Sequence, residues 1–539
     1  MNTSTPRQST GVYLTRLLKT YGVEVVFGIP GVHTVELYRG LDGSGLRHVT
    51  PRHEQGAGFM ADGYARASGK PGVCFIISGP GMTNIVTAMG QAYGDSIPML
   101  VISTVNAHGR MGSGEGWLHE LPNQSGLVAG VSAFSRTVNR PEELAPALAQ
   151  AFAVFDGARP RPVHIELPIN VMLADASHLA VPSDPPRLRR SVPSPEDIAT
   201  AVALLNGAKS PLILAGGGAV RSAALVKDLA EVLDAPVVMT TNARGILPPD
   251  HPLGVHLTPS MPQTRALVAA SDVVLALGTE MGPTDYDFYE DGGFAIPGKL
   301  IRVDIDPTQI MRNYMPSLGL VGDVTEALVN LTPLVAPRPI RTGAERARIA
   351  NTGCADLPGP MRANLRILDL IRDTLPEALI VGDSTQLVYA GNTAFAASVP
   401  GGYFNSATGF GTLGYGLPAA IGAALGAPNR PVVALVGDGG LQFSSAEFAS
   451  AVEAKTSIIM MLHDNSGYGE IKSYMQSLSI PPLGVDILTP DLASIARACG
   501  WQTDRLDAPE QLAPKLRAAA DLGLPSLLIF NDKFTLDFK

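Results

Sequence analysis

The alternation of two kinds of segment along the chain most constrains its fold. Short β-rich apolar runs alternate with helical segments over the whole 539 residues. Runs without a polar face fit strands buried inside a parallel sheet, because helices cover both faces of such sheets. A chain of this length exceeds one hydrophobic core and suggests about three units. We therefore expect an α/β protein made of three doubly wound parallel-sheet domains.

Two Pro- and Arg-rich stretches indicate where the units are joined. Pro182–Pro195 and the segment 333–361 are typical of linkers that cross the surface. We therefore expect domains at residues 1–182, 190–335 and 360–539. The expected strands are Val23–Phe27, Val73–Ile77, Met99–Ser103 and Val163–Leu167 in the first domain, Pro211–Leu214, Val237–Thr240, Val273–Leu277 and Leu300–Ile305 in the second, and Ala378–Val381, Val432–Val436, Ile458–His463 and Ser526–Phe530 in the third.

Charge and composition argue against several kinds of partner. The net charge is −9 and no long basic run occurs, so nothing indicates nucleic acid or an anionic membrane. No apolar stretch reaches the ~20 residues needed to cross a bilayer, and the polar start Met1–Thr10 shows no signal peptide. Cys74, Cys354 and Cys499 fit neither a disulfide framework nor a zinc site, which predicts a reducing, cytoplasmic location.

Polar clusters follow two apolar runs of the third domain. Val432–Val436 leads into Gly437, Asp438, Gly439 and Gly440, and Ile458–Leu462 leads to Asn465, Gly467, Tyr468 and Gly469. Ligands bind at the carboxyl ends of strands in open α/β sheets. Asp438, Asn465 and the Gly467 carbonyl offer oxygen ligands to Mg²⁺ or another divalent cation such as Ca²⁺ or Mn²⁺. Glycines let backbone N–H groups approach a phosphate. The plainer alternative is two ordinary strand-end turns.

The order Gly-Asp-Gly, helix, strand, Asn resembles the signature of the thiamine diphosphate enzymes. Pro51–Arg66 resembles the family segment whose glutamate, here Glu54, hydrogen-bonds N1′ of the aminopyrimidine and promotes loss of the proton from C2 of the thiazolium. Taken alone, Glu54 would be a helix-start carboxylate favoured by the helix dipole. The resemblance covers essentially the whole chain and is closest to the acetolactate synthase and 2-oxo acid decarboxylase branch.

The resemblance also assigns the remaining cofactor contacts. It places Leu413 at the bulky residue that bends the cofactor and the Gly411 carbonyl opposite the 4′-amino group; taken alone, Leu413 would be a core leucine. In this family the first domain of one subunit meets the third domain of another, which implies at least a homodimer and predicts a homotetramer. The implied cofactor-binding residues are Pro30, Glu54, Gly81, Asn84, Ser384, Thr385, Gly411, Leu413, Gly437, Asp438, Gly439, Gly440, Asn465, Gly467, Tyr468 and Gly469.

Departures from the two well-known branches bear on the reaction. Acetolactate synthases carry a glycine–arginine motif for FAD, but the matching run Leu277–Asp285 has acidic residues and no arginine, so we expect no FAD. Pyruvate-type decarboxylases have an aspartate after Gly-x-Pro-Gly, where this chain has Val32 and His33, and a histidine pair where it has only His119. His119 is either a proton relay or a structural histidine. Gln124 matches a glutamine that acetolactate synthases keep near the substrate.

Glu470 is the most informative departure, because both branches place an apolar side chain there, over the thiazolium. A carboxylate at that point costs desolvation unless a cation meets it. The stretch Gly11–Leu41 also resembles the 5-guanidino-2-oxopentanoate (2-ketoarginine) decarboxylases of arginine breakdown. We therefore expect decarboxylation of this small 2-oxo acid to 4-guanidinobutanal and CO₂. Alternatively, Glu470 pairs with Lys472 or faces solvent.

Two other functions stay open. The chain could be a carboligase of the acetolactate synthase type that acts on pyruvate, in which a second carbonyl compound, rather than a proton, captures the decarboxylated substrate. It could also be a non-catalytic regulatory relative. The joint presence of Glu54, Asp438 and Asn465 argues against the latter, since such a relative needs none of them.

Overall fold

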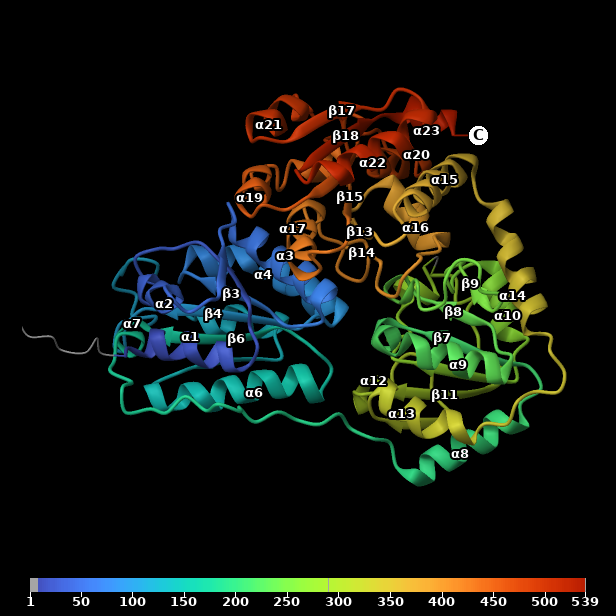
Figure 1. The fold of residues 1–539 in the computed structure, drawn as a ribbon, viewed down its shortest axis with the longest axis horizontal. Helices are drawn as coiled ribbons and strands as arrows, with labels where there is room; N and C mark the ends of the chain where they lie inside the picture. The colour runs from blue at the N-terminus through green and yellow to red at the C-terminus, as the bar shows by residue number, and fades with distance from the viewer. Residues whose placement is uncertain (1–7, 289, 539) are drawn as a thin grey trace, which may run out of the picture.

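The computed structural model describes residues 8–288 and 290–538 and contains three six-stranded sheets, in which every strand pair is parallel (Figure 1). The expected fold class is therefore confirmed. Most of the polar start Met1–Thr10 lies outside the described residues. Within the described ranges, no helix combines the length and the apolar character needed to cross a membrane. The domain boundaries themselves stay a prediction.

The first and third sheets share one strand order. The first sheet runs β2 (Arg47–Val49), β1 (Val25–Gly28), β3 (Gly72–Ile76), β4 (Met99–Val105), β6 (Val163–Pro168), β5 (Phe134–Thr137). The third runs β14 (Tyr403–Asn405), β13 (Leu379–Gly382), β15 (Val432–Gly437), β16 (Ile458–His463), β18 (Ser526–Phe530), β17 (Gln502–Arg505). The central sheet differs, in the order β12 (Leu318–Val321), β11 (Lys299–Asp304), β10 (Val273–Leu277), β7 (Pro211–Ala215), β8 (Val237–Met239), β9 (Gly254–Val255).

Helices cover the sheets, since their apolar stripes need a partner surface. The longer ones are α1 (Thr10–Thr20), α3 (Glu54–Ser68), α4 (Pro80–Asp95), α6 (Leu144–Gly157), α8 (Pro195–Gly207), α9 (Ala223–Leu233), α15 (Gly359–Thr374), α16 (Gln386–Ala394), α17 (Gly416–Gly426), α20 (Gly469–Ser477) and α22 (Leu512–Leu522). The shorter ones include α2 (Val35–Leu41), α10 (Pro262–Ala269), α13 (Val324–Leu331), α18 (Asp438–Leu441), α19 (Glu447–Glu453), α21 (Leu492–Ala498) and α23 (Asp532–Asp537).

One linker prediction was wrong. The stretch from Pro182 runs without helix or strand until α8 begins, as predicted (Figure 1). The segment 333–361 instead contains α14 (Gly343–Asn351) and the start of α15. The small apolar residues Ala347 and Ala350 are buried against the central domain, and the Gly343 N–H donates to Asp234 Oδ2 at 2.7 Å. The polar and charged residues of α14 therefore lie on the outer face of a helix that packs on the central domain.

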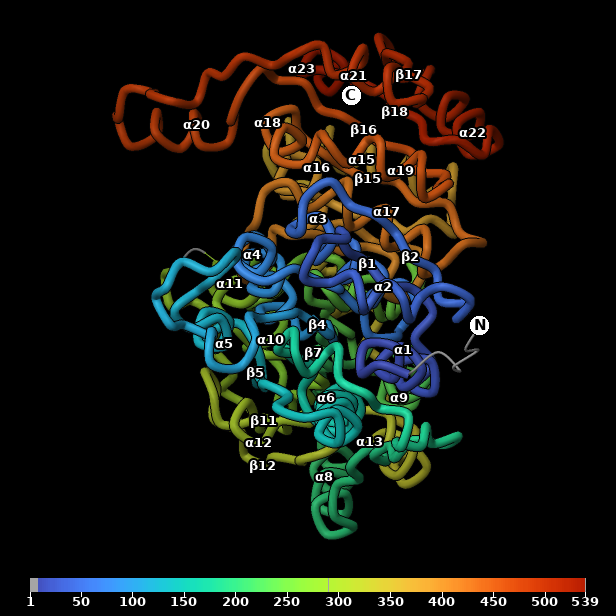
Figure 2. The backbone as a smooth tube through the Cα atoms, turned by 90° about the vertical axis from the view of Figure 1, so that its left-hand side faces the viewer, coloured from blue at the N-terminus to red at the C-terminus, as the bar shows by residue number. Residues whose placement is uncertain are grey.

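Helices α3 and α17 join the first and third domains through glycines (Figures 1 and 2). A Cβ on Gly63 would lie 2.0 Å from the Ala419 carbonyl oxygen, and one on Gly422 would lie 1.9 Å from the Met60 carbonyl oxygen. No residue larger than glycine fits at either point. Close backbone approach thus fixes the two sheets relative to each other, and with them the loops at their strand ends.

Candidate active site

The predicted metal ligands meet at the carboxyl ends of β15 and β16. Gly437 pairs with His463 across the two strands, so the residues that follow leave the sheet together. Asp438 is fully buried, and the Asn465 N–H donates to its Oδ1 at 3.4 Å. The Thr489 hydroxyl donates to its other carboxylate oxygen. The structure thus brings Asp438 and Asn465 together, as the sequence predicted.

The spacing of these groups fits a divalent cation. The terminal amide atom of Asn465 that faces them lies 3.0 Å from Asp438 Oδ1 and 2.9 Å from the Gly467 carbonyl oxygen. An NH₂ group there would donate to both, whereas the amide oxygen there makes three acceptors converge. Octahedral Mg²⁺ with oxygen ligands at about 2.1 Å sets neighbouring ligand oxygens roughly 2.9 Å apart. Asp438, Asn465 and Gly467 can therefore hold such an ion.

The same cluster needs further ligands from outside the protein. Among the described residues, no three or more His, Cys, Asp or Glu side chains are grouped as a metal site. A single carboxylate with two neutral oxygens leaves room for phosphate oxygens in the coordination shell. This ligand set is what a metal shared with a bound diphosphate requires.

The predicted diphosphate residues surround this point. A Cβ on Gly439 would lie 2.8 Å from the Tyr468 ring, and one on Gly469 would lie 2.6 Å from the Asn465 amide nitrogen. A Cβ on Gly437 would lie 3.3 Å from the Thr385 hydroxyl, and one on Gly440 3.3 Å from Asp383 Oδ1. The glycines therefore keep side chains out of a crowded strand-end crevice. Their contact with a diphosphate, and that of Ser384, stays a prediction.

Asp383, which the sequence prediction did not select, links the diphosphate segment to the loop with Leu413. Its buried carboxylate accepts from the Ser384 N–H at 2.8 Å and the Gly416 N–H at 3.0 Å. Burial raises the pKa of Asp383 to about 6. Its position directly after a strand was the only available sequence signal.

The loop that holds Gly411 and Leu413 is anchored on the first domain. The N–H and hydroxyl of Thr412 both donate to Gln91 Oε1, at 3.3 and 3.0 Å. Gly411 has a φ of 75°, in the left-handed region that favours glycine. Leu413 is half-buried beside it. The anchored backbone gives the predicted cofactor-bending residue a fixed position.

The predicted acid, Glu54, begins helix α3. Asn84 Nδ2 donates to Glu54 Oε2 at 2.8 Å, and a Cβ on Gly81 would lie 3.3 Å from Glu54 Oε1. The structure therefore brings Glu54, Gly81 and Asn84 together at the carboxyl end of the first sheet. Pro30 is exposed after β1 at the same end.

A buried carboxylate of the third domain holds the turn before Glu54. Glu447 accepts from the Arg52 N–H at 3.0 and 3.1 Å and from the His53 N–H at 3.2 Å. Its side chain is buried, and burial raises its pKa. No local signal in the sequence distinguished Glu447, because its partners are backbone groups almost four hundred residues away.

A second histidine lies beside His119. The ring centroids of His33 and His119 are 5.1 Å apart, and His33 Nδ1 lies 2.6 Å from Ser78 Oγ. In the sequence, His33 stood out only as the residue after Val32, which occupies the position of the missing aspartate. His119 itself packs its backbone against Gly79, where a Cβ would lie 2.7 Å from the His119 carbonyl oxygen.

Gln124 supports this loop from inside the first domain. Its Oε1 accepts from the Gly79 N–H at 3.0 Å, and its Nε2 donates to Thr104 O at 2.9 Å and Glu166 Oε2 at 3.0 Å. The amide is buried and engaged at both ends. Gln124 therefore holds the Gly79 loop, and its predicted role near the substrate stays a prediction.

Glu470 lies exposed at the start of α20. Gln386 Nε2 donates to Glu470 Oε2 at 2.5 Å. Lys472 instead pairs with Asp486 at 2.7 Å, so the alternative pairing of Glu470 with Lys472 does not form. The other alternative, that Glu470 faces solvent, agrees with its exposure in the single chain. Burial, and then the charge of Glu470, raises the pKa of Tyr389 to about 12. Glu470 therefore offers a carboxylate next to the diphosphate segment.

The central domain has the topological switch point at which such sheets bind dinucleotides, and the absence of FAD stays a prediction. Its strand order reverses between β7 and β10, where such sheets bind dinucleotides. The loops there touch: the Gly218 N–H donates to Gly278 O at 3.0 Å. Asp285 is turned inward to Thr241 at 3.2 Å, and Glu280 pairs with Arg159 at 2.8 Å. The run Leu277–Asp285 contains no Lys or Arg that could face this switch point.

We expect the purified protein to be colourless, because the run Leu277–Asp285 lacks the arginine of the flavin motif. An absorbance spectrum of the native protein, and of its heat-released supernatant, measures this. Bound flavin in a ratio near one per chain would contradict the prediction.

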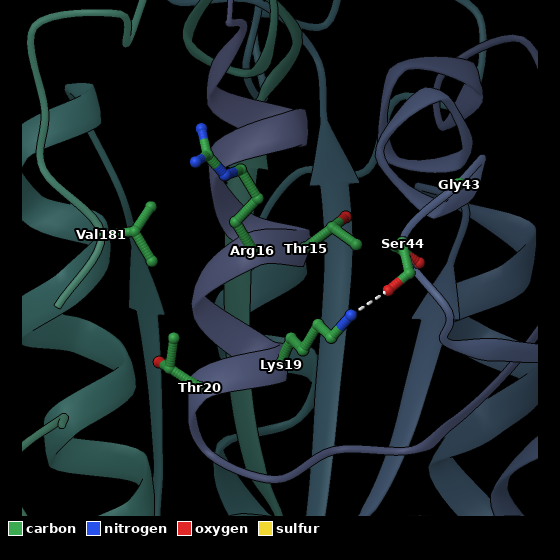
Figure 3. A pocket seen from close by; sticks show the side chains of 7 residues that line it. All are labelled: Thr15, Arg16, Lys19, Thr20, Gly43, Ser44 and Val181. Carbon is green, nitrogen blue, oxygen red and sulfur yellow. Dashed lines mark hydrogen bonds between the residues drawn. The ribbon is translucent and has the colours of Figure 1, made fainter. Parts of the chain in front are cut away.

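A surface hollow lies elsewhere in the first domain (Figure 3). It has a volume of about 430 Å³ and is lined by α1, Gly43, Ser44 and Val181. Lys19 already donates to the Ser44 carbonyl oxygen there, at 2.5 Å. None of the predicted site residues lines this hollow, so the active site is assigned to the strand ends.

Known proteins resemble this chain along most of its length. Three family models match: the N-terminal TPP binding domain of thiamine pyrophosphate enzymes at residues 8–127, their central domain at 198–331, and their C-terminal TPP binding domain at 383–530. The chain is 45% identical to the probable 2-ketoarginine decarboxylase AruI of Pseudomonas aeruginosa, over 94% of this chain and 91% of that protein.

More distant relatives carry another activity in their names. The chain is 32% identical to the acetolactate synthase isozyme 1 large subunit of Escherichia coli, over 87% of this chain and 84% of that protein. It is also 32% identical to a probable acetolactate synthase large subunit of Methanocaldococcus jannaschii, over 95% and 90%.

Proposed function

The chain belongs to the thiamine pyrophosphate enzymes and uses that cofactor, and from this premise we propose that it decarboxylates 5-guanidino-2-oxopentanoate to 4-guanidinobutanal and CO₂. The observation that carries the substrate is the carboxylate of Glu470 beside the diphosphate segment, held by Gln386. The name of the Pseudomonas aeruginosa relative supports the same substrate. The free thiols of Cys74, Cys354 and Cys499 support a cytoplasmic enzyme.

The residues divide the work by position. Bound cofactor supplies an electron sink that accepts the electron pair left when CO₂ departs. Asp438, Asn465 and Gly467 would hold the divalent metal and, through it, the diphosphate. Glu54, oriented by Asn84, would share a proton with N1′ of the aminopyrimidine. Leu413 would pack against the cofactor.

A homodimer at minimum, and a tetramer in its full form, completes this site. Helix α20 follows the metal-ligand segment and buries none of its own residues. Its side chains Ile471 and Tyr474 are 53 and 61% exposed, and Leu478, which directly follows it, is 54% exposed. Apolar surfaces of this kind are typical of subunit interfaces. This supports a second copy that covers α20 and brings its Glu54 to the cofactor.

Glu470 discriminates between substrates in this proposal. A guanidinium presents a planar donor fork that matches a carboxylate. We expect Glu470→Gln to lower kcat/KM for 5-guanidino-2-oxopentanoate by roughly ten- to a hundredfold, because a neutral amide pairs poorly with the cation. The same variant should lose little activity with uncharged 2-oxohexanoate.

Steady-state kinetics on both substrates measures this split. Glu510→Gln makes the same change of charge on an exposed part of the third domain and should leave both values unchanged. Equal losses on both substrates would mean that Glu470 serves the fold or the chemistry. A wild-type enzyme without preference for the guanidino acid would overturn the substrate, while leaving the cofactor unaffected.

The acetolactate synthase relatives keep carboligation as the second candidate. Product analysis with pyruvate alone separates the two functions: acetaldehyde and CO₂ indicate simple decarboxylation, and acetolactate indicates carboligation. We expect no acetolactate, since the electron pair is captured by a proton in the proposed reaction.

A further inference from the structure

We propose that His33 and His119 form a catalytic dyad that delivers the proton to the substrate carbon from which CO₂ has left. This inference rests on the proposed decarboxylation and adds a residue, His33, that works with His119. It assigns the dyad one step and leaves substrate binding and CO₂ release to other groups.

The contacts of His33 fix the orientation of its ring. Its Nδ1 is bound to the hydroxyl of Ser78, which is fully buried, so one ring nitrogen is fixed and the other is directed away from Ser78. The His119 ring lies edge-on to it, with an interplanar angle of 66°. Nδ1 of His119 is buried, and no described residue hydrogen-bonds it. A buried ring nitrogen without a partner is costly unless a ligand supplies one.

The backbone at His119 is in a strained conformation. His119 has a φ of 58°, which is uncommon for a residue with a Cβ, and such strain clusters at functional sites. The loop is tied on both sides of it: Asn106 donates to Leu118 O at 3.0 Å, and Glu120 accepts from the Trp117 N–H at 3.0 Å. The strained conformation is therefore imposed by the surrounding loop.

The dyad and Glu54 lie at the same end of the first sheet. Ser78 and Gly79 lead directly into Gly81, which lies against the Glu54 carboxylate. Gly31, two residues before His33, packs on Ile77, where its Cβ would lie 2.3 Å from Cδ1. Both histidines therefore face the carboxyl ends of β1 and β3, where the resemblance places the aminopyrimidine.

The step balances with one proton. The bond between C1 and C2 of the 2-oxo acid breaks, CO₂ leaves, and the electron pair left on C2 takes a proton from an imidazolium. The second imidazole then recharges the first from solvent, and the aldehyde leaves. Burial, and then the proximity of His119, lowers the pKa of His33, so the pair holds one proton more readily than two.

The decisive experiment separates protonation from decarboxylation. With ferricyanide present, two equivalents of oxidant remove the electron pair from C2 and water supplies an oxygen, so the acid forms and C2 needs no proton. We expect His33→Gln and His119→Gln each to lower aldehyde formation by roughly a hundredfold, with little further loss in the double variant. CO₂ release with ferricyanide should stay close to the wild-type rate.

The controls distinguish a failure of the dyad from a failure of the proposed function. His178→Gln changes an exposed histidine of the same domain, paired with Glu142, and should change neither rate. Aldehyde rates near wild type in either variant, equal loss of both rates, or fully additive losses in the double variant would overturn the dyad. A wild-type protein that releases no CO₂ from any 2-oxo acid would overturn the proposed function instead.

A second measurement needs neither substrate nor cofactor. NMR titration of the imidazole ring protons in the cofactor-free protein follows the pKa of His33. His119 is the ionisable group whose charge acts on His33, and Ser78 is its hydrogen-bond partner. His119→Gln should therefore raise the pKa of His33, because a neighbouring positive charge is lost. An unchanged pKa would contradict the coupling.

Discussion

A Glu54→Gln variant is expected to bind thiamine diphosphate normally and to turn over roughly a hundred- to ten-thousandfold more slowly than the wild-type enzyme. Glutamine keeps the shape of the side chain and can still accept from Asn84, whose amide donates to Glu54 Oε2. It cannot share a proton with N1′ of the cofactor. The loss should therefore fall on kcat, while cofactor affinity stays unchanged.

Turnover and cofactor binding are measured separately, by CO₂ release and by equilibrium titration with thiamine diphosphate. Glu24→Gln is a matched control, since Glu24 is an exposed carboxylate of the same domain, paired with Lys70. Near-normal turnover of Glu54→Gln would remove Glu54 from the mechanism.

Asp438→Ala is expected to weaken thiamine diphosphate binding by roughly a hundredfold or more, since loss of an outer-shell partner alone costs roughly ten- to a hundredfold in metal affinity and a direct ligand should cost more. Asp438 is the one carboxylate of the predicted ligand set, and it also accepts from Asn465 and Thr489. The wild-type enzyme should lose the cofactor on treatment with a chelator, and the variant should not respond.

Asp464→Ala is the neighbouring control, because Asp464 leaves the adjacent strand, β16, and among the described residues its carboxylate accepts only the local Ser466 N–H, at 3.3 Å. It should bind the cofactor as the wild-type protein does. Unchanged affinity of Asp438→Ala, with and without chelator, would rule out metal-mediated binding at this residue.

Combining these two variants tests the proposed dimer. In a mixed dimer of Glu54→Gln and Asp438→Ala subunits, a site built across the interface places both defects in one site and leaves the other intact. We expect such dimers, co-expressed with two tags and purified through both, to recover about half of the wild-type activity. A site contained within one chain would leave them inactive.

The strands predicted from sequence are the inner strands of each sheet. The outermost strands, β2 and β5, β9 and β12, and β14 and β17, were all missed. An inner parallel strand is buried on both faces and therefore appears as a continuous apolar run. The edge strands are only two to four residues long, and several are partly exposed, as in Gln502–Arg505. Short length and mixed polarity leave no periodic signal.

The site residues likewise fall into those that the sequence could predict and those that it could not. Residues that lie within a strand-end loop, such as Asp438 and Asn465, could be predicted because their neighbours along the chain carry the pattern. Glu447 and His33 could not, since each acts through contacts that only the fold creates. The hydrogen bond of Gln124 to the Gly79 N–H could not be predicted for the same reason, and its role near the substrate stays a prediction.

The crossing of α3 and α17 shows an internal symmetry. Gly63 contacts Ala419, and Gly422 contacts Met60. Gly63 is thus equivalent to Gly422, and Met60 to Ala419, and the two members of each equivalent pair are separated by the same number of residues. Reciprocal contacts of this kind define an isologous, two-fold interface. Together with the shared strand order of the first and third sheets, they relate the two domains by an approximate internal two-fold symmetry. Glu54 and Leu413 are separated by that same distance in the sequence, so the predicted acid and the predicted cofactor-bending residue occupy equivalent positions in the two domains.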